Sequence, residues 1–248
     1  MDLTEENRKM NNSEYWKIFE YDVVDSTNEI AKKICEHRHK RFVVTANIQT
    51  TGKGQYGRKW LSPSGENFLA TFCVPRIEIT SDTLISFAVA NAVCIILKEC
   101  GFASQCKWPN DIEINSSKIA GILTEKINDW LLIGIGLNLN WPKKRSELVD
   151  GKRYTSLYAE SDKEFNVNEF VSLLSKELNS QINKSTAGIL KLYKSFWNKK
   201  RNIKILVDDV WIPARQTGID SEGALIVESV HGNIIKIKTS ARVRTNVV

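Results

Sequence analysis

A short loop at residues 52–60, GKGQYGRKW, carries three glycines and three cations within nine residues. The glycines permit positive φ angles and close approach of the backbone to a ligand; they are Gly52, Gly54 and Gly57. The cations are Lys53, Arg58 and Lys59. Successive backbone N–H groups beside cations form a concavity that binds anions. The loop therefore suits a carboxylate or a phosphate. Taken alone, such a loop is more often a flexible basic turn, and it lacks the GxxxxGK[ST] pattern of the P-loop.

Three further motifs follow the loop. They are KWPND at residues 107–111, KIAGIL at 118–123 and GIGLN at 134–138. Pro109 interrupts strand pairing and leaves the side chains of Asn110 and Asp111 free to turn inward. Asp111 offers the hard oxygen ligand that Mg²⁺ prefers beside phosphates. Lys118, on the far arm of an expected hairpin, can return its ammonium to the same place and stabilise developing negative charge. The alternatives are that Asn110 and Asp111 form only a turn and that Lys118 is a charge at the hairpin edge.

Taken in order, these motifs resemble those of biotin–protein ligases. The resemblance begins with Ser26-Thr27-Asn28 and Gln49, continues through the loop and the three later motifs, and covers residues 21–248. It implies an α+β fold, in which a mixed β-sheet catalytic domain of the class II synthetase-like, lipoate–biotin ligase type carries a small C-terminal SH3-like β-barrel. Several independent motifs in the right order are far more specific than any one of them.

The resemblance also implies a two-step reaction. Biotin and MgATP give biotinyl-5′-adenylate and pyrophosphate, and a lysine of a biotin carboxyl carrier protein domain then attacks the mixed anhydride. ATP, Mg²⁺ and the substrate biotin are the implied ligands. Attack of a carboxylate on an α-phosphate brings two anions together, so cations and a metal must supply the stabilisation. No Ser–His or Cys–His nucleophile is required, and none is evident.

Family roles transfer position by position. The catalytic residues are expected to be Lys118, Lys53 and Asp111, with Asp111 as the magnesium ligand. The expected ligand-binding residues are Ser26, Thr27, Asn28, Gln49, Gly52, Lys53, Gly54, Gln55, Arg58, Trp60, Lys107, Asn110, Lys118, Gly121, Gly136, Asn138 and Tyr154. Ser26, Thr27 and Gln49 resemble the groups that bind the biotin ureido head. Arg58 and Lys107 are placed near the phosphates, Trp60 beside the adenylate and Asn138 near adenine. Two simpler interpretations stay open: Ser26 could serve only a capping box with Glu29, and Trp60 could be a core aromatic.

Some positions depart from the family pattern. The loop is commonly GRGRxGR, and Lys53 and Gln55 stand here where arginines are usual. Lys53 keeps the charge but loses the planar fork, and Gln55 loses the charge. We therefore expect the adenylate to be released more readily than from an arginine form. The aromatic that stacks on adenine is expected to be Tyr154, with Trp141 as the alternative.

Apolar periodicity places these motifs on a succession of elements. A helix is predicted from Thr27, with Ile30, Ala31, Ile34 and Cys35 on its buried side. Strands are predicted at 42–46, 67–74, 105–108, 112–114, 119–126 and 131–139, and helices at 82–100, 167–182 and 187–198. From residue 199 only short strands are predicted, at 203–207, 210–216, 224–227 and 234–238. The predicted domains are 21–198 for catalysis and 199–248 for the barrel, with no domain in residues 1–20. Those twenty polar residues are too short for a winged helix-turn-helix, so a monofunctional ligase without specific DNA binding is expected.

Composition sets broad limits. The chain has 248 residues, 42% of them hydrophobic and 26% charged, and its net charge of +6 selects no class of partner. It contains no run of about 18 uncharged apolar residues, so no membrane segment is expected, and no secretory signal is visible. None of the five cysteines forms a CxxC pair, which favours reduced thiols in a cytoplasmic protein. Strand edges could support a homodimer.

Two other functions compete with this interpretation. A lipoate or octanoate ligase-type acyltransferase shares the fold, but that family expects an arginine pair followed by a triple glycine, which this chain lacks. A non-enzymatic ligand sensor or nucleic-acid-binding protein would bind nucleic acid tightly with a steep salt dependence. The presence of Asp111 and Lys118 argues against that second class.

Overall fold

The computed structural model describes residues 9–12, 16–37, 40–60, 65–79, 84–142, 153–199 and 201–245. The strands are β1 (Lys9–Asn12), β2 (Lys17–Val24), β3 (Phe42–Gln49), β4 (Asn67–Pro75), β5 (Gln105–Lys107), β6 (Asp111–Ile114), β7 (Ser117–Ile127), β8 (Trp130–Asn138), β9 (Asn202–Val207), β10 (Val210–Ile219), β11 (Leu225–Ser229), β12 (Ile234–Ile237) and β13 (Val243–Thr245). The helices are α1 (Thr27–Cys35), α2 (Ile85–Glu99), α3 (Leu157–Ser161), α4 (Val167–Ile182) and α5 (Thr186–Phe196). Short 3-10 helices occupy Gln55–Gly57, Arg76–Glu78 and Ser240–Arg242.

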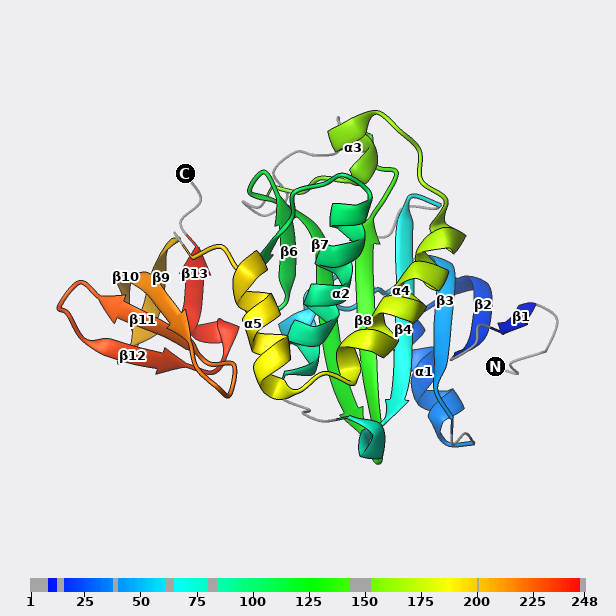
Figure 1. Cartoon of the computed structure of the whole chain (residues 1–248), viewed down its shortest axis with the longest axis horizontal. Helices are drawn as coiled ribbons and strands as arrows, with labels where there is room; N and C mark the ends of the chain where they lie inside the picture. Colours follow the sequence, from blue (N-terminus) through cyan, green and yellow to red (C-terminus); the bar gives the residue numbers. More distant parts are fainter. Residues whose placement is uncertain are drawn as a thin grey trace.

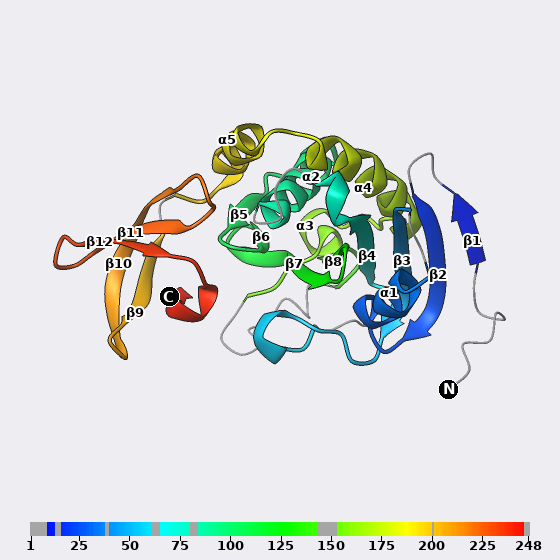
Figure 2. The same ribbon diagram turned by 90° about the horizontal axis from the view of Figure 1, so that it is seen from below.

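The main body is an eight-stranded sheet in the order β1-β2-β3-β4-β8-β7-β6-β5. The sheet is mixed, because β2 and β3 run parallel while the other neighbouring pairs are antiparallel. Helices α2, α4 and α5 cover one face (Figure 1). Helix α1 and the glycine-rich loop (residues 52–60) lie on the opposite face (Figure 2). The mixed α+β fold predicted from the sequence is confirmed, and the loop lies on the sheet face that the long helices leave open.

Helix α2 forms the centre of the core. It is apolar around most of its circumference, as expected for a helix enclosed between other elements. Its buried residues pack against β5, β6 and β7 on one side and against α4 and α5 on the other. Asn91, buried within it, donates from Nδ2 to the carbonyl of Ile189 at 3.0 Å and so ties α2 to α5. The face of the sheet behind the glycine-rich loop thus rests on a closely packed layer.

The last five strands form a separate antiparallel sheet, the C-terminal sheet, in the order β12-β11-β10-β9-β13. Asp208 and Asp209 adopt left-handed φ angles of 46° and 62° in the β9–β10 turn, the geometry of a tight hairpin turn. Trp108 donates from Nε1 to the carbonyl of Gly223 at 2.9 Å and links this sheet to the main body. Figure 1 shows the C-terminal sheet beside α5, at the opposite end of the molecule from β1.

The structure differs from the predicted elements mainly near the N-terminus. Strand β2 begins at Lys17, four residues before the expected start of the catalytic domain. This strand does not show an alternation of apolar and polar residues, because adjacent side chains on opposite faces of the sheet are both buried. Ile18 packs into the large core beneath α2, whereas Phe19 packs into the smaller core beneath α1. Strands β1 and β13 and helix α3 are short and were not predicted.

Three sequence interpretations can be checked directly. The capping box is wrong, because no side-chain capping bond from Ser26 is found in the described part of the chain and the Glu29 carboxylate pairs with Lys32 and Lys53 instead. All five cysteines lie within the described residues and are free. Within the same ranges, no helix combines the length and apolar character needed to cross a membrane.

Candidate active site

A cavity of about 780 Å³ opens on the sheet face that carries α1 and the glycine-rich loop. Every site residue predicted from the sequence lines it except Gly52. Further lining residues come from strands β4, β7, β8 and β13, from the KWPND segment, from the segment after β8 and from the 3-10 helix before β13; they include Ala70, Trp108, Leu123, Gly134, Trp141, Ser240, Val243 and Arg244. Motifs spread over more than a hundred residues therefore meet in one space.

A polar cluster, formed by Thr27, Asn28, Gln49 and Thr71, lies at one end of this cavity. Gln49 Oε1 accepts from the backbone N of Thr27 at 2.8 Å and from its hydroxyl at 3.1 Å. Thr71 Oγ1 lies 2.5 Å from Asn28 Oδ1 and 2.8 Å from Thr27 Oγ1. Asn28 Nδ2 donates to Glu125 Oε2 at 2.6 Å. Because each amide is held by named partners, the cluster is oriented before any ligand arrives.

The glycine-rich loop folds back on itself. Gly54 N donates to the carbonyl of Arg58 at 2.7 Å, and Trp60 N donates to the carbonyl of Gly52 at 2.8 Å. A Cβ on Gly52 would lie 2.7 Å from the Trp60 carbonyl oxygen, so this crossing requires glycine. At the tip, Tyr56 takes a left-handed φ of 58°, which is rare for a bulky residue.

The cation of Lys53 is paired in the structure. Its Nζ lies 2.7 Å from Glu29 Oε1 on α1, and Lys32 contacts the same oxygen at 2.9 Å. Hydrogen bonds from Lys53 and then Lys32 lower the pKa of the Glu29 carboxyl. Lys53 therefore ties the start of the loop to α1.

The Trp60 indole rests directly on the backbone of two strands. A Cβ on Gly136 would lie 2.3 Å from Trp60 Cε2, and one on Gly121 would lie 2.9 Å from Cζ3. Lys118 Nζ stands 5.3 Å from the Trp60 ring centroid, within range of a cation–π contact. Trp60 is thus packed against the sheet and forms part of the cavity wall, but it is only partly buried and belongs to neither core cluster.

Lys118 and Asp111 form an ion pair, with Nζ 2.6 Å from Oδ1 and each side chain less than a fifth exposed. The β6–β7 hairpin brings them together: Asn115 and Ser116 make its turn with positive φ angles, and the register shifts between Ile112 and Glu113. The expectation that Lys118 returns to Asp111 is confirmed.

Two neighbours of this pair are held in structural contacts. Lys107 Nζ pairs at 3.0 Å with the buried Glu113, which also binds the guanidinium of Arg201. Asn110 Nδ2 donates to the carbonyl of Ile122 at 2.7 Å, and Asn110 accepts from the backbone N of Ile122. Both residues line the cavity, but Lys107 is bound to β6 and Asn110 to β7. Contrary to the expectation from the sequence, the Asn110 side chain is therefore not left free to turn inward.

The far end of the cavity holds Asn138 and the two candidate aromatics. Asn138 is almost fully buried and donates from Nδ2 to the carbonyl of Thr155 at 2.9 Å, while its Oδ1 has no partner among the described residues. Tyr154 and Trp141 both line the cavity. The choice between them as the adenine-stacking residue stays open.

Comparison with known proteins identifies the family of this chain. A profile of the Biotin/lipoate A/B protein ligase family matches residues 20–140. The Bifunctional ligase/repressor BirA of Escherichia coli is 30% identical over 217 residues, which covers 83% of this chain and 67% of that protein. The Biotin--[acetyl-CoA-carboxylase] ligase of Paracoccus denitrificans is 36% identical over 124 residues, 46% of this chain and 51% of that protein. The chain belongs to the biotin/lipoate A/B protein ligase family.

Solved structures of the same family share the whole fold. The biotin protein ligase from Aquifex aeolicus, in complex with biotin and ATP, superposes with a TM-score of 0.79 at 25% identity and covers 92% of this chain and 99% of its own. The biotin protein ligase from Leishmania major in complex with biotinyl-5-AMP gives a TM-score of 0.64 at 23% identity, with 89% and 98% covered. The likeness extends across both sheets.

Sequence reasoning missed two sets of residues. Thr71 and Glu125 orient the polar cluster, and Thr71 left a usable signal, since it is a polar residue in the middle of a mostly apolar strand. Ser240, Val243 and Arg244 reach the cavity from the C-terminal sheet. No local pattern marks these three, because Ser240 contacts Gln55 in the loop and β13 carries Val243 and Arg244 through its pairing with β9.

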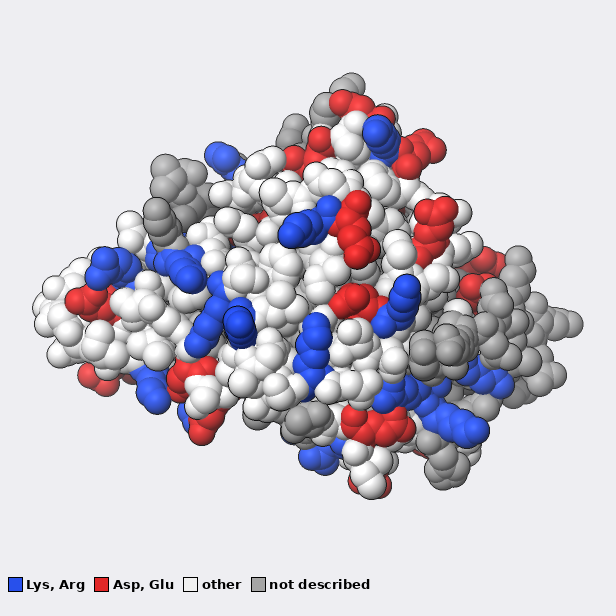
Figure 3. Space-filling model, in the orientation of Figure 1, with Lys and Arg blue, Asp and Glu red and all other residues white. Residues whose placement is uncertain are grey.

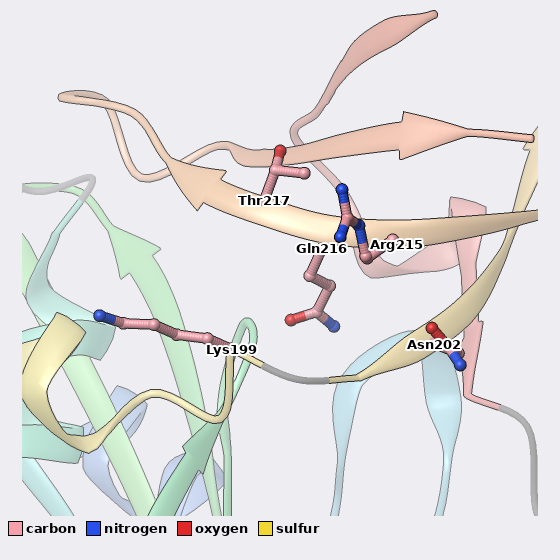
Figure 4. A pocket seen from close by; sticks show the side chains of 5 residues that line it. All are labelled: Lys199, Asn202, Arg215, Gln216 and Thr217. Carbon is pink, nitrogen blue, oxygen red and sulfur yellow. The ribbon is translucent and has the colours of Figure 1, made fainter. Parts of the chain in front are cut away.

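A second hollow lies where the main body joins the C-terminal sheet. It has a volume of about 420 Å³ and is lined by Lys199, Asn202, Arg215, Gln216 and Thr217 (Figure 4). Arg215 is paired there with Glu228 at 2.7 Å. Figure 3 shows lysine and arginine side chains gathered near this junction on the helix-covered face. The predicted motifs contribute nothing to this hollow, so the larger cavity is the candidate active site.

Proposed function

We propose that this protein is an ATP-dependent ligase that activates biotin as biotinyl-5′-adenylate and transfers the biotinyl group to a lysine of a biotin carboxyl carrier protein domain. One observation carries the proposal: a single cavity joins the polar cluster, the Lys118–Asp111 pair and the cationic loop. The polar cluster would bind the neutral head of biotin. The Lys118–Asp111 pair would lie near the biotin carboxylate, and the loop cations would lie near the phosphates of ATP.

The polar cluster would hold the biotin head. A cyclic urea presents one carbonyl acceptor and two N–H donors, so a fixed set of hydroxyl and amide groups can match it in one orientation. Thr71 and Glu125 stabilise that set from behind. The indole of Trp60 would cover the apolar part of the substrate.

Lys118 would act where the two reacting anions meet. Its ammonium can bridge the biotin carboxylate and the α-phosphate, and it would stabilise the charge that develops as the oxygen attacks phosphorus. Arg58, from the loop, would contact the leaving phosphates. Lys53 would reach the biotin carboxylate after leaving Glu29.

Asp111 is the proposed magnesium ligand. The described residues contain no group of three His, Cys, Asp or Glu side chains placed to hold a metal. A single carboxylate nevertheless fits Mg²⁺ in such sites, because this ion commonly binds through one or two carboxylates together with substrate phosphates and water. When bound, Mg²⁺ would neutralise phosphate charge, and Asp111 would exchange Lys118 for the ion.

The second step needs a neutral amine and no nucleophile from this chain. The carrier lysine would enter the open side of the cavity and attack the acyl carbon of the mixed anhydride, with AMP as the leaving group. We further propose a cytoplasmic location, which agrees with the five free cysteines. A homodimer, the lack of specific DNA binding, the SH3-like character of the C-terminal sheet and the division into domains at residue 199 stay predictions.

The experiment that tests the main proposal is biotin-dependent ATP–pyrophosphate exchange. Wild-type protein should catalyse exchange with biotin and not with lipoate, which separates the two ligase classes. Lys118→Ala should reduce the rate by about 10²–10³-fold, as expected for loss of a charge-stabilising group. Lys204→Ala, on an exposed position of β9, is the matched control and should keep the wild-type rate. No exchange by the wild type would overturn the assignment.

A further inference from the structure

The tip of the glycine-rich loop touches the C-terminal sheet through side chains. Tyr56 OH lies 2.5 Å from Thr239 Oγ1. Ser240 Oγ donates to Gln55 Oε1 at 3.3 Å and lies 3.5 Å from Tyr56 OH. Figure 2 shows the loop and the 3-10 helix Ser240–Arg242 facing each other on the open side of the main sheet. The contact joins residues more than 180 positions apart.

These hydrogen bonds are the main restraint on Tyr56. Its side chain belongs to no apolar core cluster and the residue is 58% exposed, so packing contributes little to its position. The backbone at Tyr56 is left-handed, a conformation that a bulky residue keeps only when its surroundings hold it there. The contacts with Ser240 and Thr239 also lower the pKa of the Tyr56 phenol, because they favour its charged form.

The partners of Tyr56 are themselves fixed. Thr239 Oγ1 accepts from the backbone N of Ala241 at 3.3 Å and caps the short 3-10 helix. Arg242 donates from Nε and Nη2 to the carbonyl of Leu206 at 3.1 and 2.9 Å, which ties this helix to β9. The loop therefore contacts a segment that is itself hydrogen-bonded to β9.

This contact closes one wall of the cavity. Gln55 and Arg58 line it from the loop, and Ser240, Val243 and Arg244 line it from the C-terminal sheet. If the two sides separated, the cavity would open between them. Neutral hydroxyl and amide groups make the contact. One of them is Gln55, at a position where the family commonly has an arginine.

We propose that Gln55, Tyr56, Thr239 and Ser240 form a latch that holds the glycine-rich loop against the C-terminal sheet and so retains the adenylate. They are positioning residues, since they would act by holding Arg58 of the loop in the cavity wall. The retention part rests on the proposed ligase function, whereas the latch itself is a property of the ligand-free chain. The C-terminal sheet would then control the closure of the glycine-rich loop over the cavity.

The test has one arm that needs no activity. Hydrogen exchange of the amides in residues 52–60 is measured in ligand-free protein for wild type, Tyr56→Phe, Thr239→Val and the double variant. Loss of one hydrogen bond should speed exchange there by roughly three- to tenfold. The double variant should show clearly less than the sum of the two single effects, because both substitutions remove the Tyr56–Thr239 bond. Tyr56→Phe also loses the Ser240 contact and Thr239→Val also loses the cap on Ala241. Thr217→Val is the matched control, since the exposed Thr217 hydroxyl donates to the carbonyl of Ile226 away from the loop.

The second arm measures dissociation of biotinyl-adenylate, which should accelerate by a similar factor in Tyr56→Phe and Ser240→Ala. Ser240→Ala removes a different contact of the same latch and guards against a folding defect in one variant. Unchanged amide exchange in all the latch variants, or additive effects in the double variant, would overturn the latch. Faster amide exchange in a protein without biotin-dependent activity would instead refute the ligase function and leave the latch standing.

Discussion

Lys118 Nζ lies 2.6 Å from Asp111 Oδ1, so the ammonium and the carboxylate neutralise each other within the cavity. Both side chains are largely buried, and either charge left alone there would be costly. The proposed function would require an exchange of partners, in which the substrate anions would bind the Lys118 ammonium and Asp111 would be free to hold Mg²⁺.

The pair predicts the behaviour of Asp111→Asn. The amide keeps the shape but cannot bind a divalent ion as strongly, and it leaves Lys118 without its counter-charge. We expect the ATP–pyrophosphate exchange rate to fall by about 10²-fold or more, and the Mg²⁺ concentration for half-maximal rate to rise. A magnesium titration of the exchange rate measures both. Asp209→Asn, in the exposed β9–β10 turn, is the control. A wild-type magnesium dependence in Asp111→Asn would remove this residue as the metal ligand.

The packing of the Trp60 indole against Gly136 of β8 leads to a second prediction. In Gly136→Ala the new methyl group would lie 2.3 Å from the indole, so Trp60 must move away from β8. We expect the KM for biotin to rise about tenfold or more, together with a change in the tryptophan fluorescence. A Cβ on Gly218, in β10, would meet its neighbours only at 3.4 Å and beyond. Gly218→Ala should therefore leave both measurements unchanged, and a normal KM in Gly136→Ala would contradict the proposed role of Trp60.

The parts of the fold that local chemistry encodes could be predicted from the sequence. Helix α4 has the predicted bounds, because its apolar spacing is regular and Asn166 caps it. The β6–β7 hairpin was predicted from its turn residues. Strand β2 was missed because it contributes apolar side chains to cores on both faces of the sheet. Its sequence therefore lacks the alternation of apolar and polar residues that would indicate a strand. The latch and the cavity residues of the C-terminal sheet depend on tertiary contacts between distant segments, which no local pattern contains.

The Glu29–Lys53 pair predicts a pH-dependent contribution to stability. The folded-state pKa of the Glu29 carboxyl is lowered from 4.5 by the hydrogen bonds from Lys53 and Lys32. A depressed pKa stabilises the folded state above pH 4.5, and this contribution is lost as the pH falls through the folded-state pKa. Because both side chains are partly exposed, we expect Glu29→Gln to cost no more than about 1 kcal/mol at pH 7.

Urea unfolding at pH 7 and at a pH below the folded-state pKa of Glu29 measures this contribution. The difference between wild type and Glu29→Gln should shrink at the lower pH. Glu222→Gln is the control, because Glu222 pairs with Lys238 at 3.1 Å where both side chains are mostly exposed. A difference between wild type and Glu29→Gln that stays constant across the two pH values would show that the carboxylate charge does not matter.

Gln55 offers the last prediction, because it stands where the family commonly has an arginine. Its Oε1 accepts from Ser240 Oγ at 3.3 Å, so the loop is held here by a neutral bond rather than by a cation placed near phosphate. Gln55→Arg adds a charge beside the adenylate phosphate but removes that acceptor. We expect the charge to prevail, since a charge-assisted hydrogen bond is about twice as strong as a neutral one. Dissociation of biotinyl-adenylate should then slow by roughly three- to tenfold. Gln55→Met, which removes the acceptor without adding charge, is the matched control and should dissociate faster than wild type. Equal rates for wild type and Gln55→Arg would show that the charge at this position does not control retention, and that closure of the loop depends on its other contacts.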